Sequence, residues 1–123
     1  MKYLILIYDN PDTREIWERL PDKEKAKGLH AYTALTEALA ASGELIANEA
    51  LTDPSRTKRV AVHGGVTSTT DGPFAEAKEF LAGFYLVECA SEERAVEIAA
   101  QVPEAEFGVV EVRATQDLDA FLG

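Results

Sequence analysis

The Asp71-Gly72-Pro73-Phe74 segment carries the first candidate for chemistry. Its Asp71 carboxylate precedes a Gly-Pro turn, so it could face a pocket, or it could bond free backbone amides and cap a short helix from Ala75 to Leu81. Phe74 is expected to anchor the turn in the core. Lys78 could pair with Asp71 or Glu76 and hold an anionic ligand, although a lysine on so short a helix is usually solvated.

A second set of candidates lies on a predicted long helix. His30 precedes Glu37 by two helical turns, so this carboxylate could tune the proton affinity of the imidazole near neutral pH, but a lone helical histidine is also commonly structural or exposed. Tyr32 belongs to the buried stripe of the helix, so its ring is expected in the core, with a hydroxyl that could orient a ligand. The candidate catalytic residues are therefore Asp71, His30 and Tyr32, and the candidate ligand-binding residues are Asp71, Phe74 and Lys78.

Other kinds of site have no support in the sequence. His63 abuts Gly64-Gly65 at a predicted hairpin tip, far in sequence from His30, and neither histidine has partners at ligand spacing, so no metal site is expected. A phosphate-cradling glycine-rich loop and a nucleophile elbow are both missing, so no cofactor is expected. Cys89 is the only cysteine and is interpreted as a small core residue, with a reactive thiol as the minor alternative.

Composition narrows the class of protein. The 123 residues include 22 acidic and 12 basic side chains, a net charge of −10, which argues against direct binding to nucleic acid or to an anionic membrane. This length is that of one domain, so we expect a single domain over residues 1–123. The apolar stretch from Tyr3 to Tyr8 is too short for a signal-peptide core or a membrane span, so a cytoplasmic location is expected.

Hydrophobic patterning predicts the elements that position these residues. The segment from Lys2 to Tyr8 is apolar at odd and even positions alike, which predicts a central strand buried on both faces. A short helix from Thr13 to Leu20 follows, and then a long helix that the Asp22 carboxylate would cap and Gly43 would close. A strand from Glu44 to about Leu51 ends this half. The buried stripe of the long helix consists of Leu29, Tyr32, Leu35 and Leu39.

The second half repeats this order after an insertion. Two β-prone runs, Lys58 to His63 and Val66 to Thr70, are joined by Gly-Gly and predict a tight hairpin that projects from the main sheet. A second strand that is apolar on both faces runs from Gly83 to Ala90. Ser91 would cap the following helix, and the last strand would run from Phe107 to Ala114. The tail from Gln116 carries three apolar residues at helical spacing, Leu118, Phe121 and Leu122.

Apart from the hairpin, the order is strand, helix, strand, twice over, which is the ferredoxin-like split βαβ pattern of an α+β protein. In this pattern the helices cover one face of an antiparallel sheet, yet two strands are apolar on both faces. An exposed apolar sheet of that size is rare in monomers. We therefore expect a second copy of the chain to cover the other face, giving a homodimer.

The segment from Asp71 to Glu88, which reads Asp-Gly-Pro-Phe-Ala-Glu-Ala-Lys-Glu-Phe-Leu-Ala-Gly-Phe-Tyr-Leu-Val-Glu, resembles the DGPF branch of the YCII-related family. The resemblance also takes in the hairpin, the Tyr-Leu-Ile-Leu-Ile-Tyr strand and the ending Val109-Val-Glu-Val-Arg113. It implies a ferredoxin-like fold that dimerises into an α+β barrel, in agreement with the patterning. Most DGPF members have no assigned reaction.

The resemblance says less about chemistry. Some members of the wider family carry a His on the first long helix and an Asp-Pro after the last helix, a proposed catalytic dyad used in dehydrochlorination of an aromatic ring compound. In this sequence the His position falls on Tyr32 and the Asp-Pro position on Val102-Pro103. Both dyad members are therefore missing, and that reaction is not carried over.

Three readings of function stay open. The first is a small enzyme or small-molecule-binding protein with a pocket between helices and sheet. The second is a regulatory or protein-interaction module, because DGPF members are often encoded beside extracytoplasmic-function sigma factors. The third is an inert dimer with a weak binding role. A buried, convergent polar cluster would favour the first reading, and a filled pocket with an exposed apolar patch the second.

Overall fold

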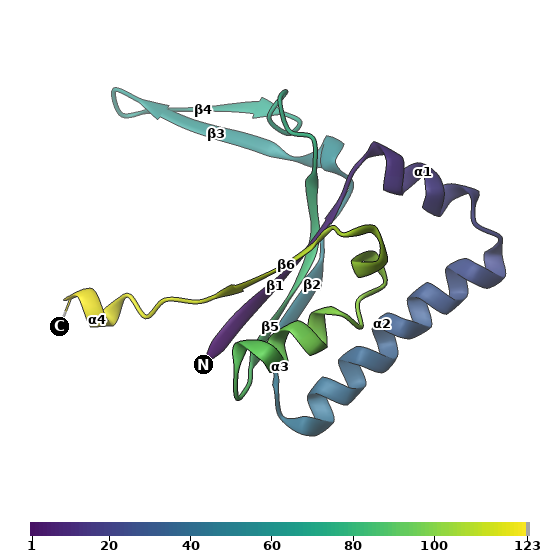
Figure 1. Cartoon of the computed structure of the whole chain (residues 1–123). Helices are drawn as coiled ribbons and strands as arrows, with labels where there is room; N and C mark the ends of the chain where they lie inside the picture. The colour runs from purple at the N-terminus through teal and green to yellow at the C-terminus, as the bar shows by residue number, and fades with distance from the viewer. Residues whose placement is uncertain (123) are drawn as a thin grey trace.

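A four-stranded antiparallel sheet forms the centre of the computed structural model, which describes residues 1–122, and its strand order is β2-β5-β1-β6 (Figure 1). This α+β arrangement is consistent with a ferredoxin-like fold, as predicted. The two strands that are apolar on both faces are the two central ones. The four strands are β1 (Lys2–Asp9), β2 (Leu45–Ala50), β5 (Phe80–Glu88) and β6 (Val110–Ala114).

The helical elements are α1 (Pro11–Arg19), α2 (Asp22–Ser42), α3 (Glu92–Ala99), a short α4 (Asp119–Leu122), and the 3-10 turns η1 (Pro54–Arg56) and η2 (Pro103–Phe107). Helices α2 and α3 lie against one face of the sheet (Figure 1). Within residues 1–122, no helix is long and apolar enough to cross a membrane.

The helix ends follow local capping chemistry. Asn10 and Thr13 form a reciprocal capping box at α1, with both bonds at 2.9 Å, so this helix begins two residues before the predicted start. Ser91 caps α3 and Gly43 closes α2 with a φ of 79°, as predicted. The predicted Asp22 cap is wrong, because Pro21 occupies the cap position without a side-chain bond and Asp22 is already helical.

The core lies between the helices and one face of the sheet. Alternate residues of the central strands point into it, among them Ile5 and Val87, which are fully buried. The predicted stripe of the long helix is confirmed for Leu35 and Leu39, whereas Leu29 is 59% exposed. The other buried core residues are Tyr3, Ile7, Tyr85, Cys89, Ala95, Ile98, Ala99 and Val102.

The opposite face of the sheet is also apolar, and no helix covers it. Directly opposed residues of antiparallel strands share a face, so Leu4 lies beside Leu86, and Leu6 beside Phe84. All four side chains are only half-buried. We call this surface, formed by Leu4, Leu6, Tyr8, Leu81, Phe84 and Leu86, the open face.

Two segments extend from the sheet on the side away from α2 (Figure 1). One is the predicted hairpin, strands β3 (Lys58–His63) and β4 (Val66–Asp71), which forms a separate two-stranded sheet. Its Gly64-Gly65 turn has φ values of 57° and 79°, the positive values expected of a tight hairpin turn. The other is the C-terminal tail with α4, whose Leu118, Phe121 and Leu122 are 66–85% exposed.

Two predicted boundaries around the hairpin and the last strand are wrong. No helix forms between Ala75 and Leu81. The chain turns there, and β5 begins at Phe80, because Phe80 and Leu81 pair with β1. The last strand begins at Val110 and not at Phe107, because η2 and Gly108, with a φ of 73°, precede it.

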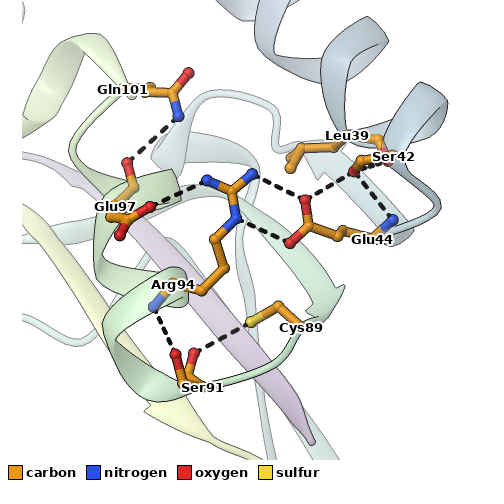
Figure 2. Close-up of polar contacts among 8 residues, drawn as sticks. All are labelled: Leu39, Ser42, Glu44, Cys89, Ser91, Arg94, Glu97 and Gln101. Carbon is orange, nitrogen blue, oxygen red and sulfur yellow. Dashed lines mark hydrogen bonds and ion pairs between the residues drawn. The ribbon is translucent and has the colours of Figure 1, made fainter.

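An ion pair joins the two halves of the fold (Figure 2). Arg94 on α3 donates to both carboxylate oxygens of Glu44, which follows α2, from Nε at 3.0 Å and from Nη2 at 2.9 Å. Ser42 adds a hydrogen bond from its hydroxyl at 2.7 Å, and Glu97 accepts from Arg94 at 3.3 Å. The bonds from Arg94 and then Ser42 lower the pKa of Glu44 to about 2.

We expect Arg94→Ala to lower the free energy of unfolding at pH 7, since it removes the bidentate partner of the Glu44 carboxylate. The folded pKa of Glu44 lies below its unfolded value, so this contribution is complete above an unfolded pKa of about 4.3 and is lost as the pH falls toward 2. Urea unfolding at pH 7 and pH 3 measures this contribution, with Arg56→Ala, which removes an exposed arginine remote from Glu44, as control. If Arg94→Ala lowered the free energy of unfolding equally at both pH values, the Arg94–Glu44 ion pair would not be the cause of the loss.

Candidate functional site

A cleft opens between α2 and the β2–β5 edge of the sheet, with a volume of about 710 Å³. That volume lies within the range of small-molecule sites. Residues from five elements line it: Ile7, Leu29, Tyr32, Thr33, Thr36, Glu37, Asn48, Glu49, Ala50, Ala82, Gly83, Phe84, Tyr85 and Glu104. No lysine, arginine or histidine is among these lining residues, so the cleft offers an anionic ligand no cationic partner.

The strand register decides which side chains enter the cleft. Asn48 is paired with Tyr85, whose side chain is buried on the helix side, and Ala50 is paired with Gly83. Glu49 and Phe84 form the pair between them, so their side chains point to the open face and they border the cleft through main-chain atoms. The floor of the cleft is therefore built from small and neutral groups.

Gly83 keeps this floor open. A Cβ at this position would lie 2.7 Å from the carbonyl oxygen of Glu49 on the neighbouring strand, closer than real side chains approach a backbone atom. Only glycine fits here without a shift of β2, and it leaves a gap above the sheet where a side chain would otherwise stand.

The main polar group of the cleft is a tyrosine–glutamate pair. Tyr32, in the middle of α2, donates its hydroxyl proton to a carboxylate oxygen of Glu104 in η2. Burial, and then the negative charge and hydrogen bond of Glu104, raise the pKa of Tyr32. Burial also raises the pKa of Glu104, against the opposing effect of the hydrogen bond from Tyr32. The Tyr32 hydroxyl and the Glu104 carboxyl group, each of which can hold a proton, therefore share one hydrogen bond at the cleft wall.

Asp9 adds a second carboxylate behind this pair. It is the last residue of β1, and one of its oxygens is buried with no hydrogen-bond partner within residues 1–122. Burial raises the pKa of Asp9, while Arg14 on α1 lowers it. The charge of Asp9 also raises the pKa of Glu104, so the local field favours the protonated form of the cleft carboxyl.

A hydroxyl relay fixes the helix turn that carries Tyr32. Thr36 donates to the Tyr32 carbonyl oxygen at 2.9 Å, and its oxygen lies 3.0 Å from the Tyr85 hydroxyl. The Tyr85 hydroxyl also lies 3.5 Å from the same carbonyl oxygen, so both hydroxyls converge on it. This relay ties α2 to β5 and holds the Tyr32 ring above the sheet.

The candidate residues selected from the sequence lie in different parts of the structure, and only one of them lines the cleft. Tyr32 lines the cleft, whereas His30 is exposed on α2 and is not among the lining residues. Asp71 ends β4 and forms an ion pair with Lys58 of β3, not with Lys78, which is exposed. Its predicted role as a helix cap is wrong, since the helix is absent.

Phe74 does not anchor a core. It is 70% exposed, and the Arg59 guanidinium lies 5.7 Å from its ring centre, so a cation–π contact holds it at the base of the hairpin. Neither Phe74 nor Asp71 reaches the cleft lining. Within residues 1–122, no group of three or more His, Cys, Asp or Glu side chains is placed to hold a metal ion.

The sequence reasoning missed Glu104, Thr36 and Tyr85. A signal for Glu104 existed, because the aligned Asp-Pro position falls on Val102-Pro103 and a carboxylate follows only one residue after the proline. The short η2 helix turns this carboxylate toward α2. Thr36 and Tyr85 carry no such signal, since an ordinary core would also contain them.

Two comparisons with known proteins bear on the chain. The family described as YCII-related domain matches residues 1–118. A relative from Rhizobium meliloti (strain 1021), named "Uncharacterized protein R00369", is 31% identical over 115 residues, which are 92% of this chain and 90% of the relative. That name assigns the relative no activity.

We expect Tyr32→Phe to destabilise the protein by about 1–3 kcal/mol, because it leaves the partly buried Glu104 carboxylate without its donor. Glu104→Gln should cost less, since its amide oxygen can still accept from Tyr32. The pKa of Glu104 is higher in the folded than in the unfolded protein. Its protonation therefore stabilises the folded wild type at a pH below the unfolded pKa, and this contribution is lost as the pH rises.

Melting temperatures at pH 4 and pH 8 measure the stability that each variant loses and the pH dependence that Glu104 causes. Glu104→Gln should gain stability relative to the wild type between pH 4 and pH 8, and Glu76→Gln, a carboxylate remote from the cleft, should not. A relative loss at pH 8 for Glu104→Gln would contradict the assigned field at the cleft.

Proposed function

Because the chain belongs to the YCII-related domain family, we propose that it binds a small organic molecule in the cleft between α2 and the sheet, with the polar end of the ligand at Tyr32 and Glu104. The observation that carries this proposal is the convergent, partly buried Tyr32–Glu104 pair at the wall of an otherwise largely apolar cleft. Such a combination of apolar lining and few polar groups is typical of ligand sites.

The pair is also equipped for proton transfer. Tyr32 falls where the resemblance places the family histidine, and Glu104 supplies a carboxylate two residues after the position of the family aspartate. A carboxyl group with a raised pKa can give or take a proton nearer neutral pH than an ordinary one. We propose that Glu104 exchanges a proton with a bound ligand and that Tyr32 orients the exchange.

A thermal-shift screen of small phenols, acids and lactones tests the proposed binding, because a ligand of the folded state raises the melting temperature by mass action. Phenols and lactones are expected to give the hits, since the cleft lining offers acids no cation. Thr33→Trp places a large ring at the cleft wall and should abolish the shift. Ala38→Trp, on the same helix but outside the lining, should leave it intact.

The outcomes separate two functions. A shift that survives Thr33→Trp would place the ligand outside the cleft and overturn the proposal. A flat screen would favour the second reading, a regulatory or protein-interaction module.

We further propose that the chain belongs to the DGPF branch of its family. The support is the Asp71-Gly72-Pro73-Phe74 motif itself, which serves a structural purpose at the base of the hairpin. Gly72 has a φ of 86°, a conformation that glycine adopts without strain, and its N–H donates to the Thr57 carbonyl at 2.8 Å. The motif thereby closes the hairpin and directs the chain into β5.

We also propose that the protein is a homodimer that buries the open face. The support is the continuous apolar surface of β1 and β5, which extends across both central strands and which the helices leave uncovered. Charges of both signs border it, with Lys2 beside Glu88, Glu111 and Arg113 on the β6 side, and Glu49 on the β2 side. A two-fold axis brings such a face onto its own copy, so that acidic and basic border residues are both available for pairing between the chains.

We expect Leu6→Glu to convert the dimer to a monomer, because the new carboxylate would be buried at the centre of the contact, beside Phe84 and Glu111. Light scattering after size exclusion should give twice the 13.4 kDa chain mass for the wild type and one chain mass for the variant. Val96→Glu, on the exposed side of α3, is the control. A wild-type monomer at micromolar concentration, or a dimer that tolerates Leu6→Glu, would count against this face.

A further inference from the structure

Within residues 1–122, the contacts that position the β3–β4 hairpin lie at its base. The Lys58–Asp71 ion pair and the bond from Gly72 to Thr57 close that base, and Arg59 lies over Phe74 just beyond it. Beyond these contacts the two strands pair with each other alone. A two-stranded hairpin without further packing is marginally stable in water, so this arm requires a surface to rest on.

The two faces of the hairpin differ in chemistry. Opposed residues share a face, so one face carries Val60, Val62, Thr67 and Thr69 beyond the basal ion pair. The other face carries Arg59, Ala61, His63, Val66, Ser68 and Thr70. The first face is thus a stripe of four β-branched side chains, in which Val60 and Val62 are 66% and 61% exposed, and the second is more polar. We call the first face the valine stripe.

The position of the arm indicates which molecule lies within its reach. The hairpin connects β2 to β5, one of the two strands that form the open face, and it extends on the side of the sheet away from α2 (Figure 1). A molecule that docks on the open face therefore comes to lie within reach of the hairpin. In an isologous pair, each hairpin would reach around the other sheet.

On the basis of the proposed homodimer, we propose that the hairpin is a clasp whose valine stripe packs against a second copy of this chain. The partner is a second copy because the open face and the arm belong to one side of the same chain, and because the border of that face carries charges of both signs in a chain of net charge −10. An unrelated basic partner would leave Lys2 and Arg113 facing like charge. The clasp extends the contact beyond the sheet.

The test compares two double variants of equal charge. Val60→Glu with Val62→Glu alters the valine stripe, and Ala61→Glu with Val66→Glu alters the opposite face of the same hairpin. Sedimentation over a dilution series should show a dimer dissociation constant raised about tenfold or more for the first pair only, as for charges placed into an apolar contact. Circular dichroism checks that both variants remain folded.

A photo-crosslinking amino acid at position 62 provides a second measurement that does not depend on stability. Dimers mixed from unlabelled and ¹⁵N-labelled chains distinguish crosslinks between chains from crosslinks within one chain. Crosslinks between chains, together with the selective loss of affinity, would support the clasp.

Each other outcome overturns it, and the outcomes are distinguishable. A stable wild-type dimer with crosslinks only within the chain, or with equal effects of the two double variants, overturns the clasp and leaves the homodimer standing. A wild-type monomer at all concentrations overturns the homodimer and the clasp together.

Discussion

The antiparallel register between β1 and β5 is the constraint on which the rest of the molecule depends. It sends Ile5 and Tyr85 toward the helices and Leu6 and Phe84 toward the open face. A slip by one residue would exchange the two sets, so it would expose the core and remove Gly83 from the floor of the cleft. The cleft and the open face are therefore consequences of one pairing.

This pairing also explains why the fold could be predicted from the sequence. Strands that are apolar at every position, a long helix closed by Gly43 and a Gly-Gly hairpin each follow from a local pattern with a physical cause. The errors fall where tertiary pairing outweighs local preference. Residues Ala75 to Leu81 have helical composition, yet Phe80 and Leu81 pair with Asp9 and Tyr8 and so lengthen β5.

The candidate site could be predicted only in part. Tyr32 was found because helical spacing places it on the buried stripe. Glu104 was missed because its contact with Tyr32 joins positions 72 residues apart, through a 3-10 turn that no periodicity indicates. Asp71 was selected for its motif, but the motif acts on the backbone of the hairpin base. The Asp71-Gly72-Pro73-Phe74 motif thus indicated local backbone geometry, and Glu104, which belongs to no motif, supplied a polar group of the cleft.

Gly83 sets a limit on how the cleft can be redesigned. Since any larger residue there would lie too close to the Glu49 carbonyl oxygen unless β2 moved, the sheet side of the cavity resists variation. The helix side has no such restriction, because Leu29, Thr33 and Glu37 are exposed positions of α2 that border the same space. Changes in ligand preference, whether in relatives or by engineering, are therefore expected to accumulate along one flank of a single helix.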